Sequence, residues 1–163
     1  MIDIKIMQDA SEIIRYDSDK LPYAIQERLL SQFTERRALC HWHPDIECIR
    51  IYEGSMCYEI NGEQILLQTG DIVIVNSGQL QYGYAHDDED CKFCVELIHP
   101  DIFKTNLHIY QENVYPIIHA SGITYWLYHK EDSNYQQVAS LLDQIFDIRN
   151  NPKDSMLCLL NGL

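Results

Sequence analysis

Two histidines and a carboxylate lie close together in the segment His41-Trp42-His43-Pro44-Asp45-Ile46-Glu47. Side chains two residues apart on an extended segment point to the same face, so His41, His43 and Glu47 are expected to converge. Two imidazole nitrogens and one carboxylate oxygen form a facial ligand set for iron, manganese, zinc or nickel. The same side chains can instead line a polar cavity, bonded to one another and to water. The residues alone leave both alternatives open.

The segments around this motif predict an antiparallel β domain. Between about residues 12 and 99, apolar residues come in short runs rich in Ile, Val and Tyr, separated by turn residues. Asn61-Gly62 is the strongest short signal for a hairpin. So many short strands at this spacing indicate a sandwich or a small barrel. The expected strands cover residues 46–52, 56–60, 64–67, 72–75, 81–84 and 93–98.

Beyond residue 130 the apolar period changes and predicts helices. Ser133-Asn134-Tyr135-Gln136 fits a capping box, and apolar residues then recur at three- and four-residue steps. Asn150-Asn151-Pro152 predicts the end of this helix and the start of a second one. The apolar face continues to Leu163, so we expect more chain or a partner to cover it. A homodimer contact is expected at Val138, Leu142, Ile145, Leu157 and Leu160.

Composition and charge exclude several classes of protein. The 163 residues, 46% hydrophobic and 23% charged, predict one folded domain with appended elements. No run of eighteen apolar residues occurs and acidic residues interrupt the first twenty, so we expect a cytoplasmic protein without a membrane partner. The net charge of −13 repels phosphate backbones, so this chain alone is not expected to bind DNA. The six cysteines are expected to be reduced.

The stretch from His41 to Gly54 reads H-x-H-x3-E-x6-G and resembles the first motif of the cupin superfamily, whose fold is a jelly-roll barrel. The stretch that begins at Gly70 resembles the second cupin motif in part, since Gly70 and Gly78 fit it. Three positions depart from that motif: Asn76 replaces its proline, Gln81 its fourth metal ligand and Ala85 its final asparagine.

The departure at Gln81 bears on the metal. Glutamine is a poor ligand for a transition metal, so the resemblance leaves at most three good ligands, His41, His43 and Glu47. We therefore expect no cofactor, or a divalent transition metal that is weakly held.

A narrower resemblance extends over nearly the whole chain. The order of its features is similar to the N-terminal sensor domain of AraC-family transcription regulators: Leu21-Pro22-Tyr23, the His41-Trp42-His43 motif with Glu47, the Asn61-Gly62 hairpin, Gly70-Asp71 leading to Val75-Asn76, and a helix pair. This resemblance implies a cupin-like barrel over residues 1–130 and a helical dimerisation segment over residues 131–163. It also implies a C-terminal helix-turn-helix domain, absent from this chain, that binds DNA.

In that interpretation the chain is not an enzyme and has no catalytic residues. Its barrel is expected to bind a small polar effector, with sugars suggested by the resemblance alone, through His41, His43, Glu47, Gln81 and Tyr58. The alternative is a stand-alone cupin metalloenzyme, an isomerase or a dioxygenase, with His41, His43 and Glu47 on the metal. The intact H-x-H-x3-E favours the enzyme, whereas Gln81 and the unfinished apolar helix favour the sensor. A purely structural dimer is the third alternative.

Overall fold

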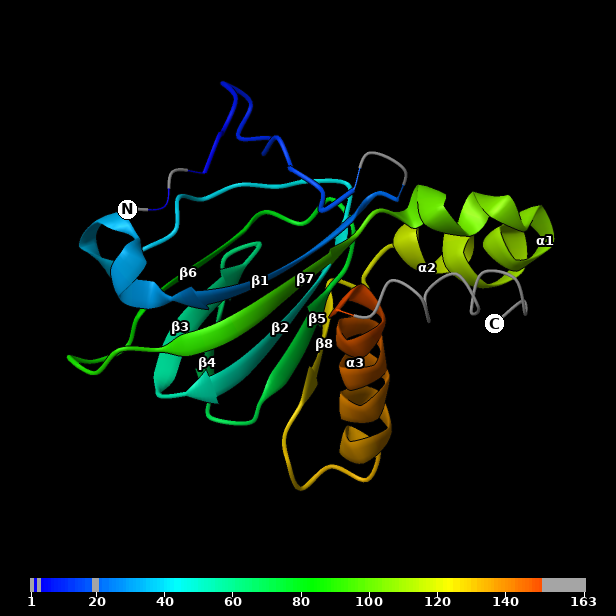
Figure 1. Ribbon diagram of the computed structural model, residues 1–163. Coiled ribbons are helices and arrows are strands. Elements are labelled where there is room, and N and C mark those ends of the chain that lie inside the picture. Colours follow the sequence, from blue (N-terminus) through cyan, green and yellow to red (C-terminus); the bar gives the residue numbers. More distant parts are fainter. Residues whose placement is uncertain (1, 3, 19–20, 151–163) are drawn as a thin grey trace. The chain divides into compact units, whose positions relative to one another are not determined.

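The computed structural model describes residues 2, 4–18 and 21–150 (Figure 1). The chain divides into two compact units, Met1–Leu127 and Tyr128–Leu163. The first unit contains the N-terminal arm, the strands that form the barrel and a short helical segment, and the second contains a helix. No helix in the part of the chain that is described is long and apolar enough to cross a membrane.

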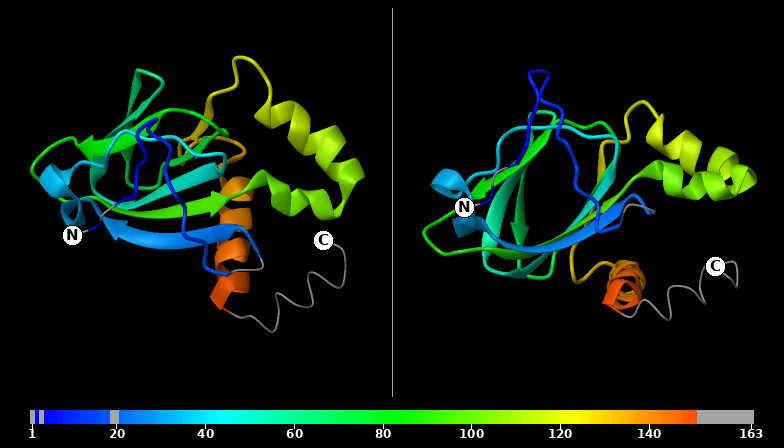
Figure 2. Two further views of the ribbon diagram at one scale, coloured as in Figure 1. Left: turned by 90° about the horizontal axis from the view of Figure 1, so that it is seen from above. Right: turned by 45° about the horizontal axis from the view of Figure 1, so that its top comes forward.

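Two sheets form the barrel, and they face each other in the right-hand view of Figure 2. The strand pairs for which the register is defined are all antiparallel, as the turn pattern predicts. The five-stranded sheet has the order β1 (Tyr23–Leu29), β7 (Lys92–Ile98), β2 (Ile46–Glu53), β5 (Ile72–Val75), β8 (Tyr125–Tyr128). The three-stranded sheet has the order β4 (Glu63–Gln68), β3 (Ser55–Ile60), β6 (Gln81–Ala85).

Side-chain alternation builds the interior of the barrel. Ile49 on β2 lies opposite Val95 on β7, and both contribute apolar side chains to the same core. Met56 and Tyr58 on β3 approach this core from the other sheet. Because successive side chains on a strand point to opposite faces, each strand gives every second residue to the interior.

The Asn61-Gly62 hairpin forms as predicted. Ile60 on β3 lies opposite Glu63 on β4, which leaves Asn61 and Gly62 as the two turn residues. Both have positive φ angles, 51° and 87°, which is what a type I′ turn requires and what Asn and Gly adopt most easily.

The N-terminal arm is tied to the segment that precedes β2. The Ile13 amide donates to Lys5 O at 2.9 Å, so the arm folds back on itself. The Glu12 amide donates to Trp42 O at 2.9 Å, and the Trp42 amide donates to Ala10 O at 3.0 Å. These bonds place the arm beside the histidine motif.

Three elements were not expected from the sequence. β1 was not predicted because its inward-facing positions include the polar residues Gln26 and Arg28, which line a cavity. The sequence therefore lacks the apolar–polar alternation that marks a strand. β8 is a four-residue strand. Between β7 and β8 the chain forms a helical segment: η3 (Pro100–Thr105), α1 (Leu107–Ile109), η4 (Tyr110–Val114) and α2 (Tyr115–Ile118).

The predicted first helix of the C-terminal part is present as α3 (Tyr135–Asn150). Its first turn includes a bond from the Val138 amide to Asn134 O at 3.1 Å. The expected second helix, with Leu157 and Leu160, lies outside the described residues. Within α3, Leu142 is buried and both Val138 and Ile145 are half-buried. The homodimer contact stays a prediction.

Candidate ligand-binding site

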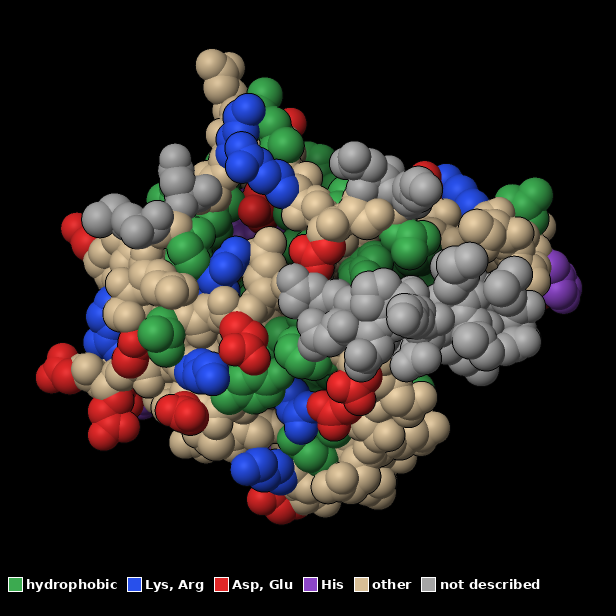
Figure 3. Space-filling model, viewed as in Figure 1, with side chains coloured by type: hydrophobic (Ala, Val, Ile, Leu, Met, Phe, Trp, Pro, Cys, Tyr) green, Lys and Arg blue, Asp and Glu red, His purple; other side chains and the backbone are tan. Residues whose placement is uncertain are grey.

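A cavity of about 670 Å³ opens between the arm and the interior faces of β1, β2, β3, β6 and β7. Figure 3 shows charged side chains of both signs around the hollow below the arm. Most of its wall is apolar, and its polar lining residues are Lys5, Glu12, Arg15, Gln26, Arg28, His41, Glu47 and Tyr58. A volume of this size suits a small organic molecule.

The five residues expected to bind a ligand are brought together at this cavity. His41, Glu47 and Tyr58 line it directly, and His43 and Gln81 are hydrogen-bonded to Glu47 immediately behind them. All five are buried. Their convergence agrees with the spacing argument, and their role in binding stays a prediction.

His43 and Glu47 form a buried ion pair, with His43 Nε2 donating to Glu47 Oε2 at 2.9 Å. Burial by itself lowers the pKa of His43, but the hydrogen bond to Glu47 and its negative charge outweigh burial, so the pKa is raised. Burial likewise raises the pKa of Glu47, and the bond and charge of His43 reverse this, so the pKa is lowered. Both shifts favour imidazolium and carboxylate.

Gln81 connects Tyr58 to this pair. The Gln81 amide donates from Nε2 to Glu47 Oε2 at 2.7 Å, and its Oε1 accepts from the Tyr58 hydroxyl at 3.0 Å. An ionised carboxylate only accepts, which fixes the amide with its NH2 group toward Glu47. Gln81 Nε2 also lies 3.2 Å from His43 Nε2, but both atoms carry hydrogen in this arrangement. The amide therefore presents a donor where a metal needs a lone pair.

Glu12 of the arm joins the site opposite His41. His41 Nδ1 donates to Leu39 O at 2.7 Å, and its Nε2 lies 3.2 Å from Glu12 Oε2. Burial raises the pKa of Glu12, against the attraction of His41. Sequence reasoning missed Glu12, because the pairing depends on the arm folding back beside Trp42, and no local pattern records that.

Asp45 is the second site residue that the sequence did not reveal. It is 1% exposed, and its Oδ1 accepts from the Tyr16 hydroxyl at 2.9 Å. Its Oδ2 lies 3.8 Å from His43 Nδ1, and neither atom has a hydrogen-bond partner among the described residues. Burial raises the pKa of Asp45, an effect that the Tyr16 hydrogen bond and the His43 charge reduce.

The residues fit a metal only in part. The nearest ligand atoms belong to Glu12, His41 and His43 and lie within 4.8 Å of one another. This set differs from the expected one, because Glu12 takes the place of Glu47. His43 Nε2 donates to Glu47, so it offers a metal no lone pair while this ion pair is formed. Gln81 turns a donor toward the cluster. A four-ligand cupin metal site does not fit these residues, and whether a three-ligand set binds a metal stays a prediction.

A family model for the AraC-like ligand binding domain matches residues 26–159, most of the chain. The chain belongs to this family. The two antiparallel sheets described above confirm the mainly β fold class that the sequence predicts. The family that the order of the motifs predicted is therefore confirmed.

A longer protein is similar to most of this chain. The chain is 25% identical over 145 residues to a Bacillus subtilis (strain 168) protein named "Uncharacterized HTH-type transcriptional regulator YdeC". The match covers 89% of this chain and 48% of that relative, so the chain spans about half the relative's length.

Two solved barrels are also similar. The Cupin 2 conserved barrel domain protein from Salinispora arenicola has a TM-score of 0.46 and 12% identity, covering 64% of this chain and 95% of its own. The plu4264 protein from Photorhabdus luminescens has a TM-score of 0.46 and 16% identity. The match covers 69% of this chain and 99% of that protein.

Proposed function

We propose that this chain is the effector-sensing part of an AraC-family transcription regulator. In this proposal the barrel binds a small polar effector, and binding controls a DNA-binding domain that lies outside this chain. The observation that supports it is the cavity of about 670 Å³, which has an apolar wall and a fixed polar network at its base. Binding pockets commonly combine a largely apolar lining with a few convergent polar groups.

The polar network gives the site a rigid part and an exchangeable part. His43 and Gln81 both hydrogen-bond to Glu47, and all three side chains are buried, so they keep their positions when a ligand enters. His41 and Glu12 line the cavity and pair only through one contact of 3.2 Å. A ligand hydroxyl or amide can replace that contact and bond to both residues.

The cavity also supplies a route from binding to regulation. Its wall includes arm residues such as Ile4 and Ile13 as well as strand residues such as Ile49 and Met56. A ligand that contacts both parts stabilises the arrangement in which the arm lies against the barrel. Its differential affinity for that arrangement is the free energy available to shift a regulator between two states.

A metal-dependent enzyme is the second candidate. The grouping of Glu12, His41 and His43 favours it, since three ligand atoms come close together. The Gln81 amide and the engaged Glu47 carboxylate favour the sensor, because they remove two groups that a cupin metal site needs.

The proposal is tested by a ligand screen with matched variants. A panel of sugars and small metabolites is added to the chain and the melting temperature is recorded. We expect at least one compound to raise it, and His41→Gln and Glu12→Gln to weaken that compound's binding. The control is His108→Gln, because His108 is exposed on α1 and does not line the cavity. Equal binding by all three variants would contradict the assignment of the cavity.

A further inference from the structure

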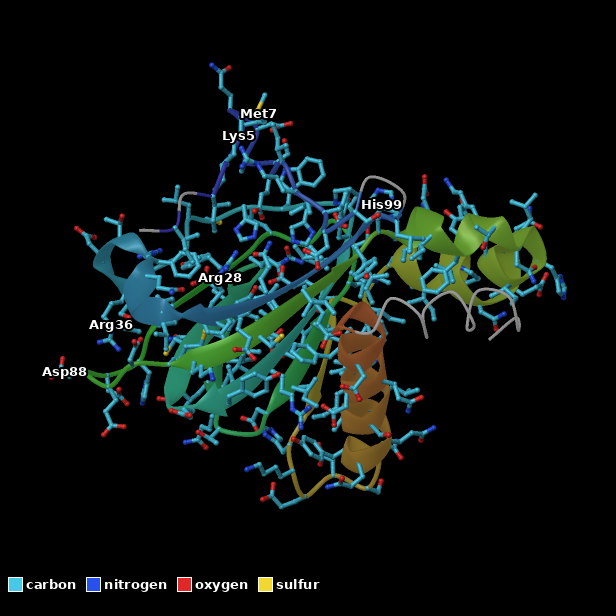
Figure 4. All side chains as sticks on the ribbon, in the orientation of Figure 1. Lys5, Met7, Arg28, Arg36, Asp88 and His99 are labelled. Atoms are coloured by element: carbon cyan, nitrogen blue, oxygen red, sulfur yellow. The ribbon has the colours of Figure 1, made fainter. Side chains whose placement is uncertain are left out.

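Three cationic side chains line the cavity although the chain is strongly acidic. Lys5 and Arg15 come from the arm, and Arg28 comes from β1, where alternation turns Gln26 and Arg28 inward. Figure 4 shows Lys5 on the arm and Arg28 beside β1, below the arm. The chain has 12 Lys and Arg against 25 Asp and Glu, yet among the described residues three bases and two acids line this cavity. The local charge balance is therefore opposite to that of the whole chain.

Arg28 has only neutral acceptors for its guanidinium group. Its hydrogen bonds go to the Gln26 side-chain oxygen and, at 3.4 Å, to Glu27 O. In the described ranges no carboxylate lies within ion-pair distance of Arg28, Arg15 or Lys5. Arg28 is half-buried, and burial lowers its pKa against the opposing charge of Glu12. A partly desolvated cation is costly unless a countercharge is supplied.

The two acids of the cavity are engaged elsewhere. Glu47 accepts from His43 and Gln81, and Glu12 lies 3.2 Å from His41 Nε2. Neither carboxylate is placed to pair with Arg28. Within the part of the chain that the structure describes, the cavity thus holds an arginine fork without a carboxylate partner. It lies beside a wall of aliphatic and aromatic side chains: Leu30, Phe33, Ile49, Met56, Phe93, Val95 and Leu97.

We propose that the effector of this barrel is a small organic carboxylate with an apolar body. Its carboxylate would bind the Arg28 guanidinium, with Arg15 and Lys5 at the rim, and its body would pack against the apolar wall. The planar guanidinium presents paired N–H donors that match a carboxylate. A singly charged group suits the site better than a doubly charged phosphate, because Glu12 and Glu47 lie nearby. This inference rests on the proposed sensing function and replaces neutral sugars with an anionic ligand class.

The test compares matched probes that differ only in charge. Phenylacetate is compared with phenylacetamide, and octanoate with octanamide, by calorimetry and by thermal shift on the full 163-residue chain. We expect each carboxylate to bind at least about tenfold more tightly than its amide, because charge-assisted hydrogen bonds are the stronger kind. Arg28→Gln should remove most of this preference. Lys92→Gln should leave it intact, because Lys92 faces away from the cavity and pairs with Glu27.

A second measurement needs no probe. Arg28→Met removes the charge and keeps an apolar stem, so the melting temperature without ligand should be equal to or higher than that of the unchanged chain. A fall of several degrees would mean that Arg28 has a structural partner, and it would overturn the inference.

The outcomes separate this inference from the proposed function. If amides or glucose bind as tightly as carboxylates and His41→Gln weakens them, the cavity is a sensor site and the anionic class is wrong. If Arg28→Gln prefers carboxylates over amides as strongly as the unchanged chain does, Arg28 is not the countercharge and the inference fails. If no probe of either kind binds, the inference is overturned and the sensing function loses its support.

Discussion

His43 and Glu47 are four residues apart, and because the chain bends at Pro44 and Asp45, His43 Nε2 lies 2.9 Å from Glu47 Oε2. Glu47 stands on β2, and His43 precedes that strand across Pro44. Both side chains are buried, so the pair belongs to the interior of the barrel. The pair favours an imidazolium and a carboxylate side by side in this interior.

Replacing Glu47 with Gln should lower the pKa of His43. In the unchanged chain the Glu47 bond and charge overcome burial and raise that pKa. Without that bond and charge, burial outweighs the remaining attraction of Asp45 and Glu12, so we expect the pKa of His43 to fall. The measurement is an NMR titration of the His43 imidazole. His129→Gln is the control for assignment, and an unchanged His43 titration in Glu47→Gln would contradict the ion pair.

The same pair should make stability depend on pH. The raised pKa of His43 contributes stability that is fully present below its unfolded pKa and is lost as pH rises through the folded value. The lowered pKa of Glu47 contributes stability that is present above its unfolded pKa and is lost as pH falls through the folded value. The pair's contribution is therefore largest between about pH 4.3 and pH 6.5.

Urea unfolding of the unchanged chain and of Glu47→Gln at several pH values measures this contribution. Titrating groups remote from the pair, such as Asp90, largely cancel in the difference between the two proteins. We expect the difference in unfolding free energy to be greatest near pH 5.5 and to shrink above pH 8. A difference that grows with pH would contradict the protonation states assigned here.

Tyr16→Phe should destabilise the chain through Asp45. The Tyr16 hydroxyl is the donor to Asp45 Oδ1, and the other carboxylate oxygen already has no hydrogen-bond partner among the described residues. A buried acceptor that loses its donor costs about 1–3 kcal/mol. Denaturant unfolding measures the loss. Tyr84→Phe is the matched control, since its hydroxyl accepts from Gln64 at an exposed position, and its loss should stay below about 0.5 kcal/mol.

The chain should bind transition metals weakly. Gln81 presents an amide donor, and the three close ligand atoms belong to Glu12, His41 and His43. We expect elemental analysis after chelator dialysis to find less than about one tenth of an equivalent of metal. Added Zn²⁺ should bind in the micromolar range or weaker, and Glu12→Gln should weaken it further. One tightly held metal per chain after dialysis would favour the enzyme alternative.

The C-terminal helices should form a homodimer contact. Light scattering is expected to report about twice the mass of one chain at micromolar concentration. Ile145→Asp places a charge on the half-buried face of α3 and should shift the equilibrium toward monomer. Gln137→Asp is the control, because Gln137 is exposed on the same helix. Leu142→Asp is a less clean variant, since Leu142 is buried within a single chain and its loss also affects folding.

Most strands of the barrel can be predicted from local sequence, but only some of the residues that line its cavity can. Strands β2 to β7 are predictable because turn residues such as Asn61-Gly62 punctuate apolar runs. β1 was missed because Gln26 and Arg28 face inward, which breaks the alternation that marks a strand. Polar residues at inward positions therefore hide the pattern.

The site residues that lie in one local motif could be predicted, and those that the N-terminal arm contributes could not. His41, His43 and Glu47 share a local spacing, so their convergence can be inferred from strand geometry. Glu12 and Tyr16 reach the site only because the arm folds back, and their partners His41 and Asp45 are 29 residues further along. Contacts between distant segments leave no periodic signal in one sequence.

The pairing of β1 with β7 also sets the order in which this protein can assemble during translation. Tyr23 lies opposite Ile98, so β1 leaves the ribosome long before its partner exists. The β3–β4 hairpin needs no distant segment and can form first. Closing β1 onto β7 must wait until residue 98 has emerged, and such non-local closure is slow. Until then the inward face of β1, Arg28 included, remains in water, so the cavity exists only in the finished barrel.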